Sequence, residues 1–113
     1  MAQTMTDERF ERSFAQAGGW FILCSLEALI EWNKEPYHDK EARAELASKI
    51  TKKYGRELST LNYRIKHARK IIKHNRYKEA VEKARDSASI NRFHPQASKV
   101  AEKLLAKINK GKL

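Results

Sequence analysis

The sequence has few of the residues that break helices or cross-link small folds. Its 113 residues include only two prolines and four glycines, and Cys24 is the only cysteine. A lone cysteine cannot form an intramolecular disulfide, which excludes a disulfide-stapled scaffold. Cys24 lies in an apolar run and is expected to pack as a small buried side chain. An intracellular, reducing compartment such as the cytoplasm suits this composition.

Long hydrophobic runs are also missing. The longest apolar run, residues 20–30, is interrupted by Ser25 and Glu27 and is shorter than the roughly 20 residues that cross a bilayer. Residues 1–14 lack the charged-then-apolar pattern of a secretory signal. We therefore expect no membrane partner.

No stretch alternates apolar and polar residues for long enough to predict a strand. Helix-forming residues dominate instead, chiefly Ala, Glu, Lys, Leu, Arg and Ile. The sequence predicts an all-α protein, a compact bundle of five or six short helices in one domain that spans residues 1–113. With 41% hydrophobic residues, the chain can build a modest core.

The first half of the chain contains three expected helices. Thr6 is a candidate N-cap for a helix that the pair Gly18-Gly19 should end. The second helix, residues 20–33, is apolar on most sides, which favours a central core position. The alternative is that the apolar helix 20–32 meets a protein partner or a second subunit in a homodimer. After a turn, Asp39 can cap a third helix, residues 40–54, with Gly55 as its left-handed stop.

The second half is expected to hold the remaining helices. A basic helix begins near Leu58 with an apolar seam of Leu58, Leu61, Ile65, Ala68 and Ile72. It ends near His74, or continues as one long helix through the apolar positions of residues 77–84. A last helix is predicted from Pro95 to Ile108, because proline suits a first helical turn. Residues 109–113 are expected to form a frayed tail.

Positive charge is concentrated in one part of the chain. Residues 49–78 contain eleven lysines and arginines against one acid, Glu57. Outside that stretch, thirteen basic residues are balanced by thirteen acidic ones, so the whole net charge of +10 lies in thirty residues. Such clustering favours a polyanionic partner, most often nucleic acid. The alternative interpretation is a solvated charged face whose cations bind nothing.

Residues 40–74 resemble the general helix-turn-helix motif, although no particular family. In such a unit the second helix lies in the major groove of DNA. The chain departs from the usual spacing, because Gly55 follows the small residue Ala47 by eight positions and Thr51 stands where the turn glycine is usual. Either the first helix is longer than usual by about one turn, or the angle between the two helices is different.

The expected nucleic-acid contacts follow from this arrangement. Lysine and arginine pair with phosphates or with guanine, asparagine pairs with adenine, and hydroxyls bind phosphates. The predicted interface consists of Lys49, Lys52, Lys53, Arg56, Ser59, Thr60, Asn62, Tyr63, Arg64, Lys66, His67, Lys70 and Lys73, and Arg76 extends the same positive track. Double-stranded DNA is favoured over RNA, because the stretch holds few aromatic side chains on which single-stranded bases could stack.

Other functions have less support in the sequence. The four histidines and Cys24 form no ligand spacing typical of a metal site, and no phosphate-binding glycine loop or activated nucleophile is present. We expect no cofactor and no enzymatic activity. The main alternative is a protein-interaction module or inhibitor that docks its basic helix on an acidic protein.

Overall fold

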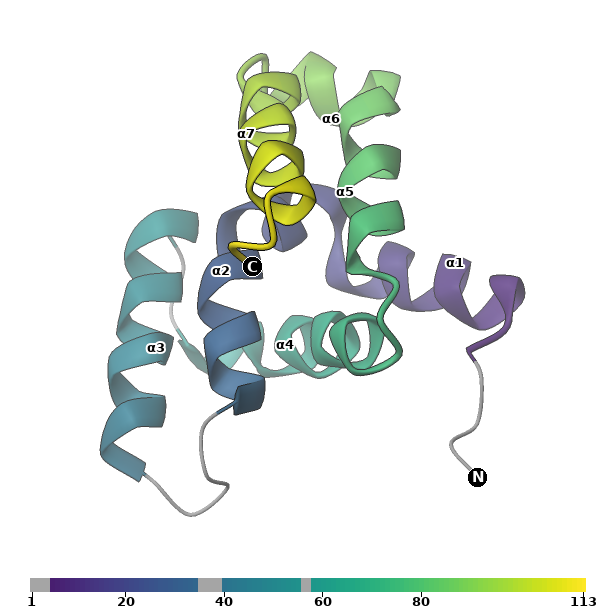
Figure 1. Cartoon of the computed structure of the whole chain (residues 1–113). Helices are drawn as coiled ribbons and strands as arrows, with labels where there is room; N and C mark the ends of the chain where they lie inside the picture. The colour runs from purple at the N-terminus through teal and green to yellow at the C-terminus, as the bar shows by residue number, and fades with distance from the viewer. Residues whose placement is uncertain (1–4, 35–39, 56–57) are drawn as a thin grey trace.

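The computed structural model describes residues 5–34, 40–55 and 58–113, and the side chains of these residues except 34, 40, 42, 43 and 58–61. Within these ranges the chain forms helices and no strand, which confirms the all-α prediction (Figure 1). The helices are α1 (Asp7–Ala17), α2 (Gly19–Lys34), α3 (Lys40–Tyr54), α4 (Leu58–Lys73), α5 (Tyr77–Asp86), α6 (Ala88–Phe93) and α7 (Ala97–Asn109). These seven described helices are more than the five or six expected, and the additional one is the six-residue α6 between α5 and α7.

Helix α1 begins and ends where its sequence predicts. The Thr6 hydroxyl accepts a hydrogen bond from the Arg9 backbone N–H at 3.2 Å, so Thr6 is the N-cap. Gly18 ends the helix with φ +86°, a conformation that favours glycine. Gly19 already belongs to α2, one residue earlier than expected, and the two helices meet at an angle of 94°.

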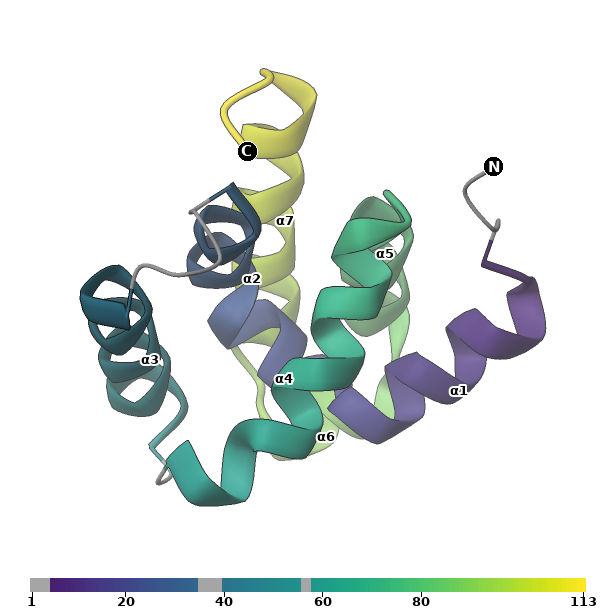
Figure 2. The ribbon, with the colours of Figure 1, turned by 90° about the horizontal axis from the view of Figure 1, so that it is seen from below.

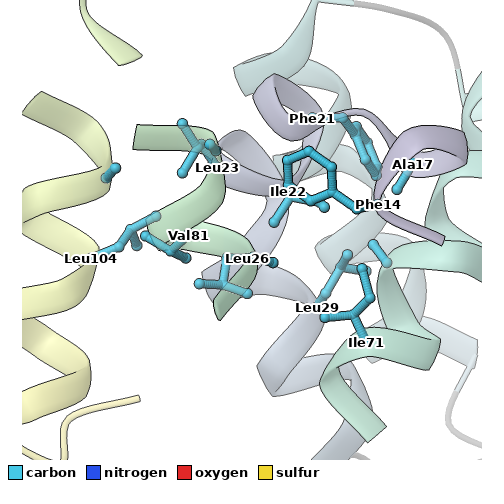
Figure 3. Close-up of a cluster of buried hydrophobic side chains, with 14 of the residues drawn as sticks. Phe14, Ala17, Phe21, Ile22, Leu23, Leu26, Leu29, Ile71, Val81 and Leu104 are labelled. Carbon is cyan, nitrogen blue, oxygen red and sulfur yellow. The ribbon is translucent and has the colours of Figure 1, made fainter. Parts of the chain in front are cut away.

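Helix α2 is the central element. Phe21, Leu23, Leu26 and Leu29 are almost completely buried, and α3, α4, α5 and α7 all pack against this helix. Figure 3 shows Leu23 and Leu26 beside side chains of α5 and α7, with Leu29 beside α4. The core interpretation of this apolar helix is confirmed. A contact with another subunit stays a prediction.

A residue with positive φ marks the end of α3 and another marks the end of α4. Helix α3 has the predicted bounds, and Gly55 follows it with φ +82°. Asp39, the expected cap of α3, lies outside the described residues. Helix α4 stops at Lys73 because Asn75 adopts φ +61° and the Arg76 N–H reaches back to the Ile71 carbonyl at 3.0 Å. Of the two arrangements that the sequence left open, the structure therefore has two helices.

Helices α5, α6 and α7 form a group at the top of Figure 1. Ser87 caps α6 by accepting a hydrogen bond from the Ile90 N–H. The predicted start of the last helix at Pro95 is wrong by two residues, because Pro95 lies in a turn and α7 begins at Ala97. Beyond α7, Gly111 has φ +70° and Leu113 packs against the core at the end of the tail that was expected to fray.

Gly18 provides a test of the α1–α2 junction. A Cβ at this position would lie 2.5 Å from an Arg64 guanidinium nitrogen, whereas a Cβ at Gly55 would meet no atom of the described residues within 4 Å. Both glycines have positive φ, so alanine at either site costs about 1–2 kcal/mol of backbone strain. We expect Gly18→Ala to lower the free energy of unfolding by about 0.5–1.5 kcal/mol beyond Gly55→Ala, because the added Cβ displaces the Arg64 guanidinium from its hydrogen bond to the Ala17 carbonyl. Urea denaturation would measure both, and equal losses would contradict this packing.

The burial of the Cys24 thiol can be tested by measuring how the stability of the fold depends on pH. Burial raises the pKa of its thiol from 9.0 to about 11, against a smaller lowering by Lys53. The folded state therefore keeps the proton at pH values where the unfolded state releases it. We expect stability to fall as pH rises from 9 to 11, and to fall less steeply in Cys24→Ala. Denaturation curves of both proteins across this range would show the difference, and parallel pH profiles would contradict it.

Candidate functional site

Helix α4 has one buried face and one cationic face. Ile65, Ala68 and Ile71 are buried, while Ile72 is only half-buried. The predicted seam omits Ile71, which a step of three residues from Ala68 brings into the core. Ile72 packs against the core from its margin, as part of the seam. The side chains of Leu58 and Leu61 lie outside the described set. The opposite side of α4 carries Lys66, Lys70 and Lys73, all exposed.

Arg64 does not point outward as predicted. Its guanidinium donates a hydrogen bond to the Ala17 carbonyl at 2.8 Å and lies 5.9 Å from the centre of the Tyr54 ring. The Ala17 carbonyl is at the C-terminus of α1, where positive charge is favourable. Arg64 therefore joins α1 to α4 and is not presented to a ligand as a free side chain.

Arg69 and Arg76 are also engaged within the protein. Arg69 donates to the Asn33 side-chain oxygen at 3.1 Å and lies 5.6 Å from the Trp32 ring centre, so it holds the end of α2. Arg76 is only 15% exposed and lies 4.3 Å from the centre of the Phe10 ring. The prediction that Arg76 extends the positive track is wrong, because its charge is used inside the fold.

The contacts of Arg76 form a clamp on the N-terminal end of α1. Its guanidinium donates to the Met5 carbonyl at 3.2 Å, to the Asp7 carboxylate at 2.9 Å and to the Glu79 carboxylate. The hydrogen bond that Arg76 donates to Glu79, and after it the one that it donates to Asp7, raises the pKa of Arg76 against the lowering effect of burial. One side chain thus connects α1, the turn after α4, and α5.

The lysines are arranged differently from these arginines. The exposed lysines of the predicted interface lie on two helices: Lys66, Lys70 and Lys73 on α4, and Lys49, Lys52 and Lys53 on α3. None of these six forms an ion pair with a carboxylate of the described residues. The two helices differ in their surroundings. Lys49 and Lys53 line a groove together with Glu27 and Glu31 of α2, whereas no acidic residue of the described part of the chain lines the grooves beside α4. The uncompensated charge is therefore strongest along α4.

Of the other residues predicted to contact nucleic acid, some have side chains that the structure describes and some do not. Asn62 is exposed, and Tyr63 is 56% exposed while its hydroxyl donates to the Gln16 side-chain oxygen at 2.8 Å. Arg56 lies outside the described residues, and so do the side chains of Ser59 and Thr60. The structure therefore brings part of the predicted set together on one side of α4.

His67 lies at the edge of this cationic face. Its ring packs edge-on against Tyr63 with 4.6 Å between ring centres, and its buried Nδ1 has no hydrogen-bond partner among the described residues. Burial lowers the pKa of His67, and the charges of Lys70 and then Lys66 lower it further. The imidazole is therefore uncharged at neutral pH, and Lys66, Lys70 and Lys73 supply the charge around it.

Two grooves flank the exposed side of α4. The first, about 480 Å³ in volume, lies between α1 and α4, and the second, about 390 Å³, lies between the end of α2 and α4. Lys70 and Lys73 line both. The first groove also contains Arg9 and Arg12 of α1, which the sequence did not predict. Their spacing of three residues, which places both on one face of α1, was the available signal.

The described residues contain no group of three or more histidine, cysteine, aspartate or glutamate side chains that could hold a metal ion. No single helix among them is long and apolar enough to cross a membrane. Taken together, α1 and residues 19–33 reach that length and composition, with the 94° bend between them.

The fold and site define a small all-α protein with a lysine-rich face on one helix. Comparison with protein-family models, curated proteins and solved structures found no match for this chain.

Arg76 can be tested separately from the exposed lysines. We expect Arg76→Gln to lower the melting temperature clearly, because it removes the hydrogen bonds to Met5, Asp7 and Glu79 and the contact with Phe10. Lys78→Gln, an exposed position two residues further on, removes the same charge and should change the melting temperature little. Equal effects of the two substitutions in thermal unfolding would show that the clamp does not stabilise the fold.

Proposed function

We propose that this protein binds nucleic acid, with double-stranded DNA favoured over RNA, through the lysine-rich face of α4. The supporting observation is that Lys66, Lys70 and Lys73 are exposed on one side of a helix without any carboxylate partner in the described residues. Uncompensated cations repel one another, and a polyanion relieves that repulsion. Phosphates of a nucleic-acid backbone meet this requirement at many successive positions.

The arginines and lysines of α4 have different surroundings, and we infer from this difference how the helix contacts nucleic acid. Arginine is the residue most often used to read guanine with paired hydrogen bonds, and Arg64, Arg69 and Arg76 are held by contacts inside the protein. Lysine acts as a mobile point charge and suits phosphate contact. We therefore expect binding to depend weakly on base sequence, with Asn62 as the main exposed group able to read a base.

The arrangement of α3, Gly55 and α4 fits the predicted helix-turn-helix order. Helix α3 packs mainly on α2, and α4 packs on α1 and α2, so the two helices are positioned by their neighbours. Figure 2 shows α4 from below, with its ribbon on the near side of α2. Contact of this side with a DNA groove is part of the proposal.

A triple substitution tests the proposal. We expect Lys66→Gln/Lys70→Gln/Lys73→Gln to weaken binding to a DNA duplex of random sequence and to reduce the salt dependence of log K by about three, since each phosphate contact contributes about 0.9. Fluorescence anisotropy at several salt concentrations would measure both quantities. Circular dichroism would check that the exposed substitutions leave the fold intact.

The matched control removes the same charge from another helix. Lys99, Lys103 and Lys110 are exposed on or next to α7, and their triple substitution by glutamine should leave most of the affinity in place. Equal affinity of the α4 variant and the unmodified protein would refute the assignment. Competition with polyglutamate that displaces the duplex at equal charge concentration would favour the alternative, an acidic protein partner.

A further inference from the structure

Helices α1 and α4 run side by side in opposite directions. Near one end the Tyr63 hydroxyl bonds Gln16 at 2.8 Å, and beyond the other end Arg76 bonds Asp7 at 2.9 Å. Each helix has its apolar side chains on the core and presents a second, polar stripe to the groove between them. This arrangement brings residues that are about sixty positions apart in the sequence to two walls of one groove.

The walls of this α1–α4 groove carry basic groups from both helices. Arg9 and Arg12 lie on α1, Lys70 and Lys73 lie on α4, and among the residues that the structure describes no carboxylate lines the groove. The full lining is Met5, Arg9, Arg12, Ser13, His67, Lys70, Lys73 and His74. Four cations around one hollow without an acid are a costly arrangement in the absence of an anion.

Neither arginine is strongly engaged elsewhere. Arg12 is 3.6 Å from Glu8, but both side chains are largely exposed, and such surface pairs contribute little. Arg9 forms no ion pair with a carboxylate in the described part of the chain. This is the opposite of Arg64 and Arg76, whose guanidinium groups bond backbone carbonyls of α1 and its N-terminal flank. Arg9 and Arg12 are therefore available to an anionic ligand.

We propose that the α1–α4 groove binds a phosphate group of the nucleic-acid strand, with Arg9 and Arg12 on one side and Lys70 and Lys73 on the other. This inference rests on the proposed function. Guanidinium groups can pair with two phosphate oxygens at once, whereas the ammonium groups act as point charges. A volume of about 480 Å³ suits a phosphate with its sugar but not a whole duplex, so the strand backbone lies in the groove.

The neighbouring groove favours a strand over a small phosphorylated molecule. Lys70 and Lys73 also line the groove on the α2 side, where Lys66 joins them. Successive phosphates of a polymer can occupy this continuous positive surface on both sides of α4. A free small molecule would use one groove and leave the other cations unneutralised.

The double variant Arg9→Gln/Arg12→Gln tests the inference. We expect weaker binding to the random DNA duplex and a salt dependence of log K reduced by about two, one phosphate contact for each arginine. The matched control is Lys99→Gln/Lys103→Gln, which removes two charges from α7 and should change neither quantity appreciably. Thermal unfolding would establish that all variants are folded under the binding conditions.

Histidine signals in NMR spectra report directly on the groove. His67 and His74 line it, whereas His94 stacks on Trp20 with 4.3 Å between ring centres on the α6 side. Adding the duplex should move the imidazole signals of His67 and His74 and leave that of His94 in place. The same titration with inorganic pyrophosphate provides the small-molecule comparison.

The outcomes separate the two proposals. If the arginine variant binds like its control while the α4 lysine variant binds weakly, the groove assignment is wrong and the proposed function stands. If both variants bind like the unmodified protein, both are wrong. If pyrophosphate moves the two histidine signals and the duplex does not, the groove takes a small phosphorylated ligand and the strand assignment fails.

Discussion

Helix α2 has almost no polar face, and the rest of the fold follows from the need to cover it. A helix that is apolar on most sides must be packed on most sides, and α1, α3, α4, α5 and α7 all contact α2. Even Ser25, completely buried in its middle, is satisfied locally, because its hydroxyl donates to the Phe21 carbonyl at 2.7 Å. The surrounding helices can therefore be short and apolar on one side only.

Covering α2 also determines what each cation of α4 can do. With Ile65, Ala68 and Ile71 on the core, a helical period of 3.6 residues places Arg64 within the buried arc and Arg69 at its margin. Long guanidinium side chains reach polar partners from such positions. The lysines at 66, 70 and 73 fall on the opposite side, where no partner in the described chain is available. The arginines of this helix thus stabilise the fold, while its lysines stay exposed to solvent.

The proposed phosphate groove depends on the pairing of two helices with different charge. The first helix is mixed in charge, since Asp7, Glu8 and Glu11 accompany Arg9 and Arg12, so its arginines do not stand out in a count of charges along the chain. Packing pairs two of these three acids with basic residues outside α1, while Glu8 stays 3.6 Å from Arg12 in an exposed pair. Asp7 bonds Arg76 and Glu11 bonds Lys83 at 2.7 Å, which leaves the arginine side of α1 facing Lys70 and Lys73.

The sequence by itself determined the helical class, the bounds of α1 and α3, the central burial of residues 20–30 and the location of the charge. These follow from local physics: capping by Thr6, stops at Gly18 and Gly55, apolar periodicity and composition. Only the tertiary structure decided that Asn75 ends α4, that Ile71 is buried more deeply than Ile72, and that Arg64 and Arg76 are structural. It also brought Arg9 and Arg12 beside α4. A count of residues along a chain cannot show these features, because whether a cation is free depends on which backbone carbonyls and carboxylates from distant segments lie within its reach.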